Sequence, residues 1–361
     1  MRIPSFSGIR RRAGALANRF RRRALVLLYH RVSDVAGDPQ LLSVGTERFA
    51  QHMDYLSRHY PVLSVGKLAG MLAAGEDVPD QCVAVTFDDG YADNLVNAKP
   101  VLERCRVPAT VYVTAGHIDH DQEFWWDELE QILLYPSTLP SRCQVQIGER
   151  IFAYSFAETA RYTSLDAERH RDWSVVSREN PTVRHQAYRD ICAFLRGVSV
   201  SERAAAMRAL RMWSGTGGTV RQTHRCLSSN EVRELGAGPF VEVGAHSVSH
   251  PVLSSLPAAS QRFEILQSKR DLEERLGHQI KSFAYPFGTK MDYSSETMDI
   301  VRDAGFTSAC ANFEEVTVRS TDRYQLPRIV VRDWSVEVFA RTLRQWIGRH
   351  EEREKLQECG G

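Results

Sequence analysis

Short apolar runs rich in β-branched residues recur along the chain and alternate with helical patterns, which limits the folds open to the sequence. Each run ends in polar or charged residues, as a strand does where it reaches the edge of a sheet. Strands that alternate with helices form parallel sheets or barrels. The sequence therefore predicts an α/β fold with strands at Ala24–Tyr29, Cys82–Phe87, Ala109–Thr114, Phe240–Ala245, Ser282–Tyr285, Thr307–Ala311 and Ile329–Val331.

Apolar residues at helical spacing predict helices that cover this sheet. The predicted buried faces are Phe49, Met53 and Leu56; Phe263, Leu266 and Arg270; and Met298, Val301 and Ala304. The last of these helices is expected to end at Gly305.

Residues 118–230 interrupt the alternation with mostly helical patterns, such as Ala187–Phe194 and Glu202–Trp213. We interpret them as a long, mainly helical insertion in the α/β domain. The predicted organisation is a basic N-terminal segment (1–23), a first part of the domain (24–117), the insertion (118–230), a second part of the domain (231–335), and a C-terminal helix and tail (336–361).

Bulk composition excludes one broad class of function. The 361 residues are 43% hydrophobic and 25% charged, with a net charge of +1. A protein that grips nucleic acid presents a strong excess of positive charge, so no nucleic-acid partner is expected. The seven cysteines are scattered without a C-x-x-C pair, which indicates reduced thiols and a cytoplasmic location.

Residues 2–23 carry many arginines and no acidic residue, with apolar residues at helical spacing. Such a segment can bind an anionic membrane surface peripherally, and it can equally be a solvated tail. The apolar run Ala24–Tyr29 is shorter than the roughly 7–15 residues of a secretory signal core. The sequence therefore predicts a cytoplasmic protein with possible membrane association, and it leaves the oligomeric state open.

Asp88 and Asp89 end one predicted strand, and His246 and His250 follow another. One carboxylate with two imidazoles binds a divalent metal ion and leaves it open to water, while a spare carboxylate can act as a base. Taken singly, the aspartates could cap a helix and the histidines could be turn residues. Because strand ends of a parallel sheet meet at one edge, we favour the metal site. Asp89 is the expected ligand and Asp88 the base, although spacing alone allows the reverse.

Trp126 belongs to an adjacent tryptophan pair at the start of the insertion. It could stack on a sugar ring beside the site, or it could lie in the core of the insertion. Asp93 and Asn94, which follow the aspartate pair, are interpreted as helix caps.

Several motifs together resemble the polysaccharide deacetylases, carbohydrate esterase family 4 of the chitooligosaccharide-deacetylase type. The resemblance covers residues of about 25–117 and 228–331. It implies a distorted (β/α)7 barrel, a divalent metal ion that is usually zinc, and hydrolysis of an N-acetyl or related acyl group on an amino sugar. The matching segments are Leu28–Val32, Thr86–Gly90, Val107–Val113, His246–His250 and Phe283–Gly288.

Carried over by position, the resemblance implies that Asp88 is the base and that Asp89, His246 and His250 are the ligands. The third motif places Tyr285, Pro286 and Phe287 along the substrate groove, and the Phe287 backbone N–H becomes a candidate donor to the oxyanion.

Two departures from the family pattern affect the expected mechanism. The third motif lacks the arginine that commonly pairs with the catalytic aspartate, and Arg328 is the candidate replacement. The last motif lacks the histidine that protonates the leaving amine. His30 is then a candidate general acid, and the alternative is that Asp88 returns the proton it has accepted.

The leading hypothesis is a deacylase of an amino sugar or glycan precursor. A catalytically impaired barrel that only binds saccharide is an alternative, because of the two departures. A redox iron enzyme is a third possibility, since two histidines and a carboxylate also form the facial triad of iron oxygenases. The additional aspartate favours hydrolysis.

Overall fold

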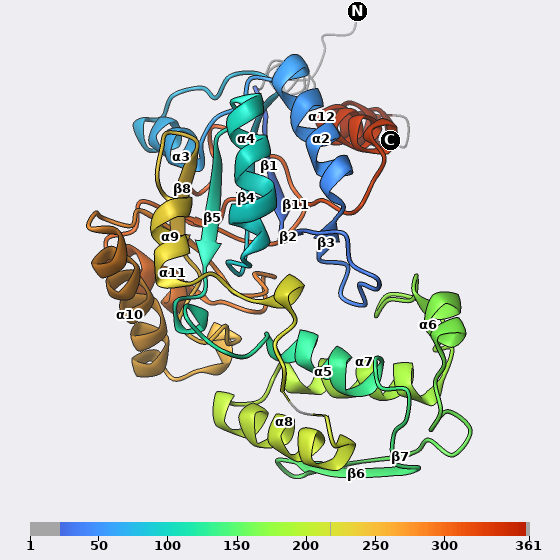
Figure 1. The fold of residues 1–361 in the computed structure, drawn as a ribbon. Coiled ribbons are helices and arrows are strands. Elements are labelled where there is room, and N and C mark those ends of the chain that lie inside the picture. The colour runs from blue at the N-terminus through green and yellow to red at the C-terminus, as the bar shows by residue number, and fades with distance from the viewer. Residues whose placement is uncertain (1–21, 217, 359–361) are drawn as a thin grey trace, which may run out of the picture.

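The computed structural model describes residues 22–216 and 218–358, and a seven-stranded parallel sheet forms its centre (Figure 1). The strand order is β10-β9-β8-β5-β4-β1-β11. The strands are β1 (Ala24–Tyr29), β4 (Cys82–Phe87), β5 (Ala109–Val113), β8 (Val241–Ala245), β9 (Ser282–Ala284), β10 (Ser308–Cys310) and β11 (Ile329–Val330). They coincide with the predicted strands to within one residue at either end. A further pair, β2 (Arg31–Val32) and β3 (Ser43–Val44), follows β1.

One irregular segment joins the two edges of the curled sheet. Leu326 forms a parallel bridge to Cys310 of β10, and Ile329 pairs with Leu27 of β1. The interruption falls at Pro327 and Arg328, where proline lacks the N–H that a sheet requires. The result is a distorted (β/α)7 barrel of parallel strands and helices, which confirms the predicted fold class.

Every residue of β1 and β4 is buried, because both faces of the sheet are covered. This explains why these strands are continuous apolar runs instead of alternating patterns. The covering helices are α2 (Thr46–His59), α3 (Val65–Ala74), α4 (Lys99–Cys105), α9 (Ser229–Leu235), α10 (Ala258–Leu276) and α11 (Ser295–Asp303), and α12 (Val336–Glu358) follows the barrel.

The predicted face of α2 is confirmed, since Phe49, Met53 and Leu56 are all buried. The predicted face of α10 is wrong, because Phe263 is 58% exposed and the buried face contains Ile265 and Leu272. That face also buries Gln261, Glu264 and Ser268, whose side chains are hydrogen-bonded. Hydrogen bonds, to other elements for Gln261 and Glu264 and to the Ile265 carbonyl oxygen of the same helix for Ser268, offset the cost of burying these polar groups, which hydrophobic periodicity does not detect.

The insertion packs at the carboxyl ends of the barrel strands, below the barrel in Figure 1. Its own apolar core includes Trp125, Leu129, Phe156 and Tyr188. Its elements are α5 (Trp125–Leu133), β6 (Arg142–Ile147), β7 (Arg150–Ser155), α6 (Ser164–His170), α7 (Val183–Leu195) and α8 (Val200–Ser214). The helical character was predicted, whereas the antiparallel β6–β7 hairpin was not.

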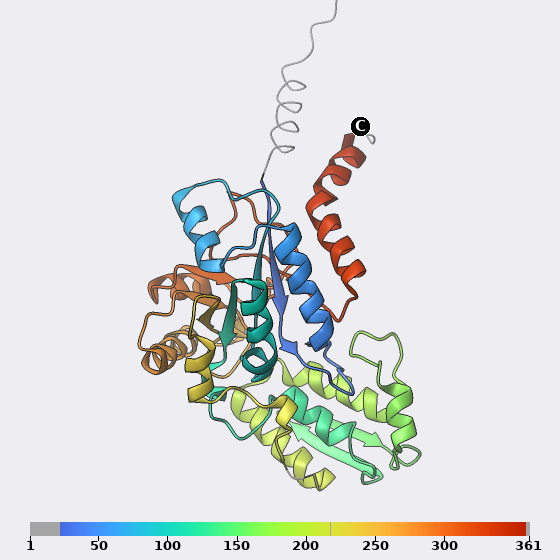
Figure 2. The same ribbon diagram turned by 45° about the horizontal axis from the view of Figure 1, so that its top comes forward.

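The C-terminal helix α12 packs on the barrel beside α2 and extends away from it (Figure 2). Phe339 and Leu343 are its buried contacts. Within residues 22–216 and 218–358, no helix combines the length and apolar character needed to cross a membrane. The basic segment 2–23 lies outside the described residues except for Arg22 and Arg23.

Candidate metal centre

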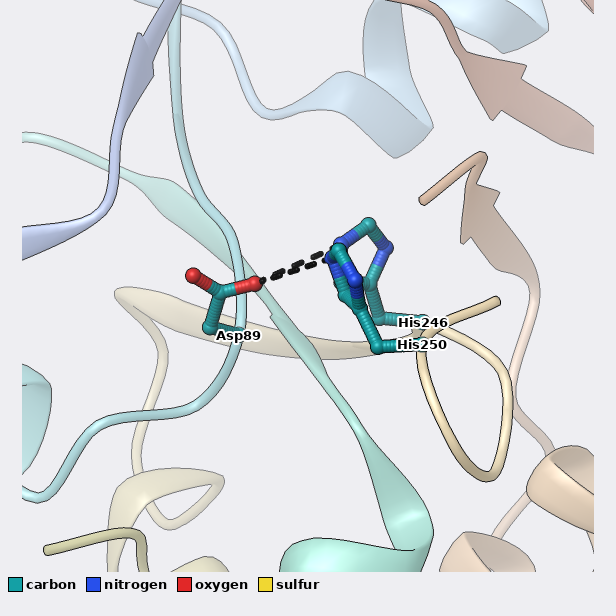
Figure 3. A group of neighbouring side chains, drawn as sticks. All are labelled: Asp89, His246 and His250. Carbon is teal, nitrogen blue, oxygen red and sulfur yellow. Dashed lines mark ion pairs between the residues drawn. The ribbon is translucent and has the colours of Figure 1, made fainter. Parts of the chain in front are cut away.

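Asp89, His246 and His250 converge on one point at the carboxyl ends of β4 and β8 (Figure 3). Asp89 Oδ1 lies 3.6 Å from His246 Nε2 and 3.4 Å from His250 Nε2, and all three side chains are buried. Two donors bound at about 2.0–2.2 Å to one tetrahedral ion are separated by about 3.3–3.6 Å. The three donor atoms therefore have the chemistry and the spacing of a divalent metal site with an open position.

Hydrogen bonding directs the His246 imidazole toward this site. Its Nδ1 lies 2.8 Å from the Ala284 carbonyl oxygen, so Nδ1 carries the proton and donates it. The lone pair is then on Nε2, which faces Asp89. Burial lowers the pKa of His246, and it lowers the pKa of His250 to about 3. Both imidazoles are therefore neutral near pH 7, the form that binds a metal ion.

The backbone is strained where it presents these ligands. Asp89 has a φ of 76°, Ser247 of 63° and His250 of 53°, values that non-glycine residues rarely adopt. Gly90 has a φ of 82°, and a Cβ there would lie 2.9 Å from the Val113 side chain, so glycine is required. Such conformations persist where the surrounding fold holds them, and they concentrate at functional sites.

Asp88 lies beside the three donors and is held by Arg328. The Arg328 Nη1 and Nη2 donate to Oδ1 and Oδ2 of Asp88, each at 2.7 Å, and the Arg328 side chain is fully buried. Arg328 Nε also donates to the Ala311 carbonyl oxygen at 2.8 Å. Burial alone would raise the pKa of Asp88. Arg328, and after it His246, lower this pKa by more than burial raises it, and the resulting pKa is about 2. Asp88 is therefore ionised throughout the physiological range.

His30 lines the same cavity at the end of β1, and residues after the aspartate pair fix its backbone. Asn94 Nδ2 donates to the His30 carbonyl oxygen at 2.9 Å, and Asp93 Oδ1 accepts from the Val32 N–H at 3.0 Å. The interpretation of Asp93 and Asn94 as helix caps is therefore wrong. Asp93 makes no side-chain cap bond to the helical turn Asn94–Ala98, because its carboxylate is engaged by β2.

Glu264 of α10 positions the segment that carries both histidines, and the sequence did not reveal it. Its Oε2 accepts from the backbone N–H groups of Val248 and Ser249 at 2.8 and 2.9 Å, and its Oε1 accepts from the Ser249 hydroxyl at 2.6 Å. No local pattern marks this residue, since its partners belong to another element. Its burial on a helical face with other polar residues becomes visible only in the structure.

With zinc as the probe of this candidate site, we expect Glu264→Gln to weaken binding of the metal ion by about 10- to 100-fold, the usual effect of removing a group that orients a metal ligand. A glutamine amide nitrogen donates, so it cannot replace one of the two accepting oxygens. The dissociation constant is measurable by competition with a chromophoric chelator. Glu274→Gln, on the exposed side of the same helix, is the matched control, and equal zinc affinity in both variants would contradict the assignment.

The donors open into a cavity of about 480 Å³ that also contains Trp126 and Phe287. The Trp126 ring centroid is 5.2 Å from that of His250, and that of Phe287 is 4.6 Å from it. Trp126 is nevertheless only 6% exposed, so it belongs both to the core of the insertion and to the cavity wall. The core interpretation of Trp126 is confirmed, and its stacking on a sugar ring stays a prediction.

The rest of the third motif does not reach the cavity. The Tyr285 ring is buried against Tyr293 at a centroid distance of 4.1 Å, and its hydroxyl donates to the Tyr324 carbonyl oxygen at 3.0 Å. Pro286 is buried as well, and its carbonyl oxygen accepts from Gly288 N–H. The expectation that both side chains lie along the groove therefore receives no support from their placement.

A second buried group, Asp127, Glu130 and His224, also brings three donor atoms together. Here a guanidinium is already present, since Arg221 Nη1 donates to Glu130 at 2.9 Å. Tyr91 donates to Asp127 at 2.6 Å, and its hydroxyl accepts from Trp126 Nε1 at 2.9 Å. This cluster connects the insertion to the strand end and holds Trp126 beside His250.

The geometry places the chain among α/β barrels that carry a carboxylate–imidazole site at the carboxyl ends of their strands. The sequence model of the family described as polysaccharide deacetylase matches residues 75–137 and 205–309. These two segments are similar in sequence to the polysaccharide deacetylases, and the unmatched stretch between them lies within the insertion.

Curated relatives match over limited lengths. "Putative polysaccharide deacetylase YxkH" of Bacillus subtilis is 29% identical over 117 residues, which are 32% of this chain and 40% of YxkH. Poly-beta-1,6-N-acetyl-D-glucosamine N-deacetylase of Escherichia coli is 28% identical over 96 residues, 26% of this chain and 14% of the relative. The chain thus matches less than half the length of each of these two proteins.

Solved structures share the fold over most of the chain. IcaB from Ammonifex degensii superposes with a TM-score of 0.54 at 18% identity, covering 90% of this chain and 97% of IcaB. The Streptococcus pyogenes deacetylase PplD, solved in complex with acetate, gives 0.51 at 16% identity, covering 90% and 99%. At these identities the likeness shows the fold alone.

Proposed function

We propose that this protein is a zinc-dependent hydrolase that removes an N-acetyl or related acyl group from an amino sugar or glycan precursor. The observation that carries the proposal is the convergence of Asp89, His246 and His250 beside an ionised Asp88 that is not part of the donor set. Three ligands with an open position and one spare carboxylate are the components of metal-assisted hydrolysis.

Asp89, His246 and His250 would hold the ion, which supplies a Lewis acid for the acyl carbonyl and lowers the pKa of water to about 7. Asp88 accepts the proton of the attacking water, and Arg328 fixes the orientation of its carboxylate through two 2.7 Å hydrogen bonds. The Phe287 backbone N–H is the proposed second donor to the developing oxyanion.

The departing amine needs a proton when the C–N bond breaks, and His30 is our proposed source. Because burial lowers the pKa of His30 and leaves its imidazole neutral near pH 7, it must first take up the proton that Asp88 accepts from water. It lines the cavity at the end of β1, where Asn94 holds its backbone. Return of the proton from Asp88 is the alternative route. Trp126 and Phe287 form apolar walls on which a sugar ring can stack.

We expect acetate release from an N-acetylated amino sugar to fall at least tenfold after dialysis against a chelator, and to recover when zinc is added. Acetate is measured by a coupled enzymatic assay, and metal content by mass spectrometry. Full activity in a metal-free preparation would refute the proposal.

The saccharide-binding alternative predicts that metal and glycan bind but that no acylated sugar is hydrolysed. Oxygen consumption with ferrous iron would instead favour a redox enzyme. The cytoplasmic location and the peripheral membrane association through residues 2–23 remain predictions, and binding of the full chain to anionic vesicles tests the second of them.

A further inference from the structure

One face of α7 forms the wall of the cavity opposite the barrel. Arg189, Cys192, Ala193 and Arg196 line the cavity at positions i, i+3, i+4 and i+7, which place them on one side of a helix. The two arginines are about 10 Å apart along the helix axis. The smaller Cys192 and Ala193 leave space between them, so the wall has a cation at each end of an open middle.

Arg196 is already neutralised by a carboxylate. Its Nη2 lies 2.7 Å from both Oδ1 and Oδ2 of Asp292, and its guanidinium stacks on the Phe287 ring at 4.5 Å. We therefore assign Arg196 to the structure of this end of the cavity.

Arg189 and Arg332 differ from Arg196, because neither forms an ion pair with a carboxylate of residues 22–216 or 218–347, the part of the chain whose side chains are described. Arg189 Nη2 donates to the Ser177 carbonyl oxygen at 2.7 Å, and its guanidinium lies over the Trp173 ring. Its Nε is buried without a hydrogen-bond partner in the described part of the chain. Arg332 donates through Nη1 to the Leu41 carbonyl oxygen. Both side chains line the cavity as cations bonded to neutral groups.

These two arginines adjoin the same short segment, residues 39–42, and therefore the same end of the cavity. Arg332 donates to the Leu41 carbonyl oxygen. Gln40 Nε2 donates at 2.8 Å to the hydroxyl of Tyr188, the residue that precedes Arg189 in the sequence. The carbonyl oxygen of Pro39 accepts from Val175 N–H, within the turn that Arg189 binds. Burial lowers the pKa of Arg332, and Asp38 and Glu314 offset this only in part. An anionic ligand at this end would stabilise both cations.

Neither aspartate of the cavity supplies a negative charge for Arg189 and Arg332, since Asp88 is paired with Arg328 and Asp89 belongs to the donor set. We propose that the acylated amino sugar carries a phosphate or diphosphate group, which Arg189 and Arg332 bind while the acyl group reaches the metal centre. Arginine is the side chain best suited to phosphate oxygens. The charge of two guanidinium groups is balanced better by a dianion than by a single carboxylate. The inference rests on the proposed function and specifies its substrate class.

The test compares deacetylation of an uncharged glycoside of N-acetylglucosamine with its phosphate monoester, a nucleotide-linked diphosphate and a prenyl-linked diphosphate. We expect kcat/KM for at least one phosphorylated form to exceed that of the uncharged glycoside by about 100-fold, and the fastest form identifies the source of the phosphate. Arg189→Gln and Arg332→Gln should each reduce this ratio about tenfold. Arg332→Lys should restore part of the preference, because lysine binds phosphate as a point charge.

Arg58→Gln, which removes the same charge from the exposed surface of α2, is the matched control and should leave the ratio unchanged. A parent protein without preference, or a preference unchanged in both cavity variants, overturns the inference while the proposed function stands. If no sugar is deacetylated, calorimetry with the metal-free protein and the phosphate monoester decides the matter separately. Binding that weakens at least tenfold in Arg189→Gln supports the anion site, and absent or unchanged binding overturns it.

Discussion

Asp88→Asn should reduce kcat for acetate release by about 10³-fold while the zinc content remains that of the parent. Asp88 Oδ2 lies 3.9 Å from His246 Nε2, and both Asp88 oxygens accept hydrogen bonds from Arg328. The change should therefore spare the metal and remove the carboxylate that accepts a proton from water. Steady-state kinetics and metal analysis on the same preparation measure the two effects together.

Asp89→Asn is the matched comparison, since it makes the same chemical change at the adjacent residue. Asp89 Oδ1 is the oxygen nearest to both imidazoles, so this variant should lose zinc affinity first and activity as a consequence. Excess zinc should then restore activity in Asp89→Asn and fail to do so in Asp88→Asn. The opposite pattern would reverse the two roles, which the sequence alone allowed.

The barrel strands could be predicted because each is a short apolar run that the fold buries on both faces. Asp88, Asp89, His246 and His250 could be predicted to meet for a related reason, since parallel strands bring their carboxyl ends to one edge. The sheet topology thus places residues that are more than 150 positions apart in the sequence next to one another (Figure 3). No detail of side-chain packing was needed for that step.

Residues whose burial depends on a distant polar partner could not be predicted. Asn94 holds the His30 carbonyl and Glu264 holds the loop between the histidines, yet neither bond leaves a periodic trace in the sequence. The same cause misplaced the buried face of α10, where hydrogen-bonded polar groups face inward. In β6, exposed and buried residues alternate as in a strand, but the helical patterns around it dominated the prediction for the insertion.

Arg328 could be predicted only in part. The third motif lacks the arginine of the family pattern, and only the position of Arg328 after a late strand suggested it as the cation near Asp88. The structure explains the position, because residues 326–330 join β10 to β1, and β1 pairs on its other edge with β4, the strand that ends at Asp88. A guanidinium attached to that segment projects inside the barrel to the carboxylate. An arginine can therefore reach Asp88 from a different strand than the third motif.

Arg328→Met should destabilise the protein by about 3–5 kcal/mol, because it leaves the Asp88 carboxylate buried without its partner. Thermal or urea unfolding measures this change. We also expect kcat to fall by about 10²-fold, since a carboxylate freed from both 2.7 Å hydrogen bonds no longer keeps its orientation toward the attacking water. Arg328→Lys should rescue little, because an ammonium group cannot form the same pair of hydrogen bonds.

Combining Asp88→Asn with Arg328→Met separates stability from catalysis. Each single variant leaves one buried charge uncompensated, whereas the double variant removes both, so much of the lost stability should return. Activity should not return, since the base is absent. A double variant that is as unstable as the sum of the two single variants would show that the Asp88–Arg328 pair is not coupled in the folded protein. Recovered stability without activity would show that the buried pair is maintained for the reaction rather than for the fold.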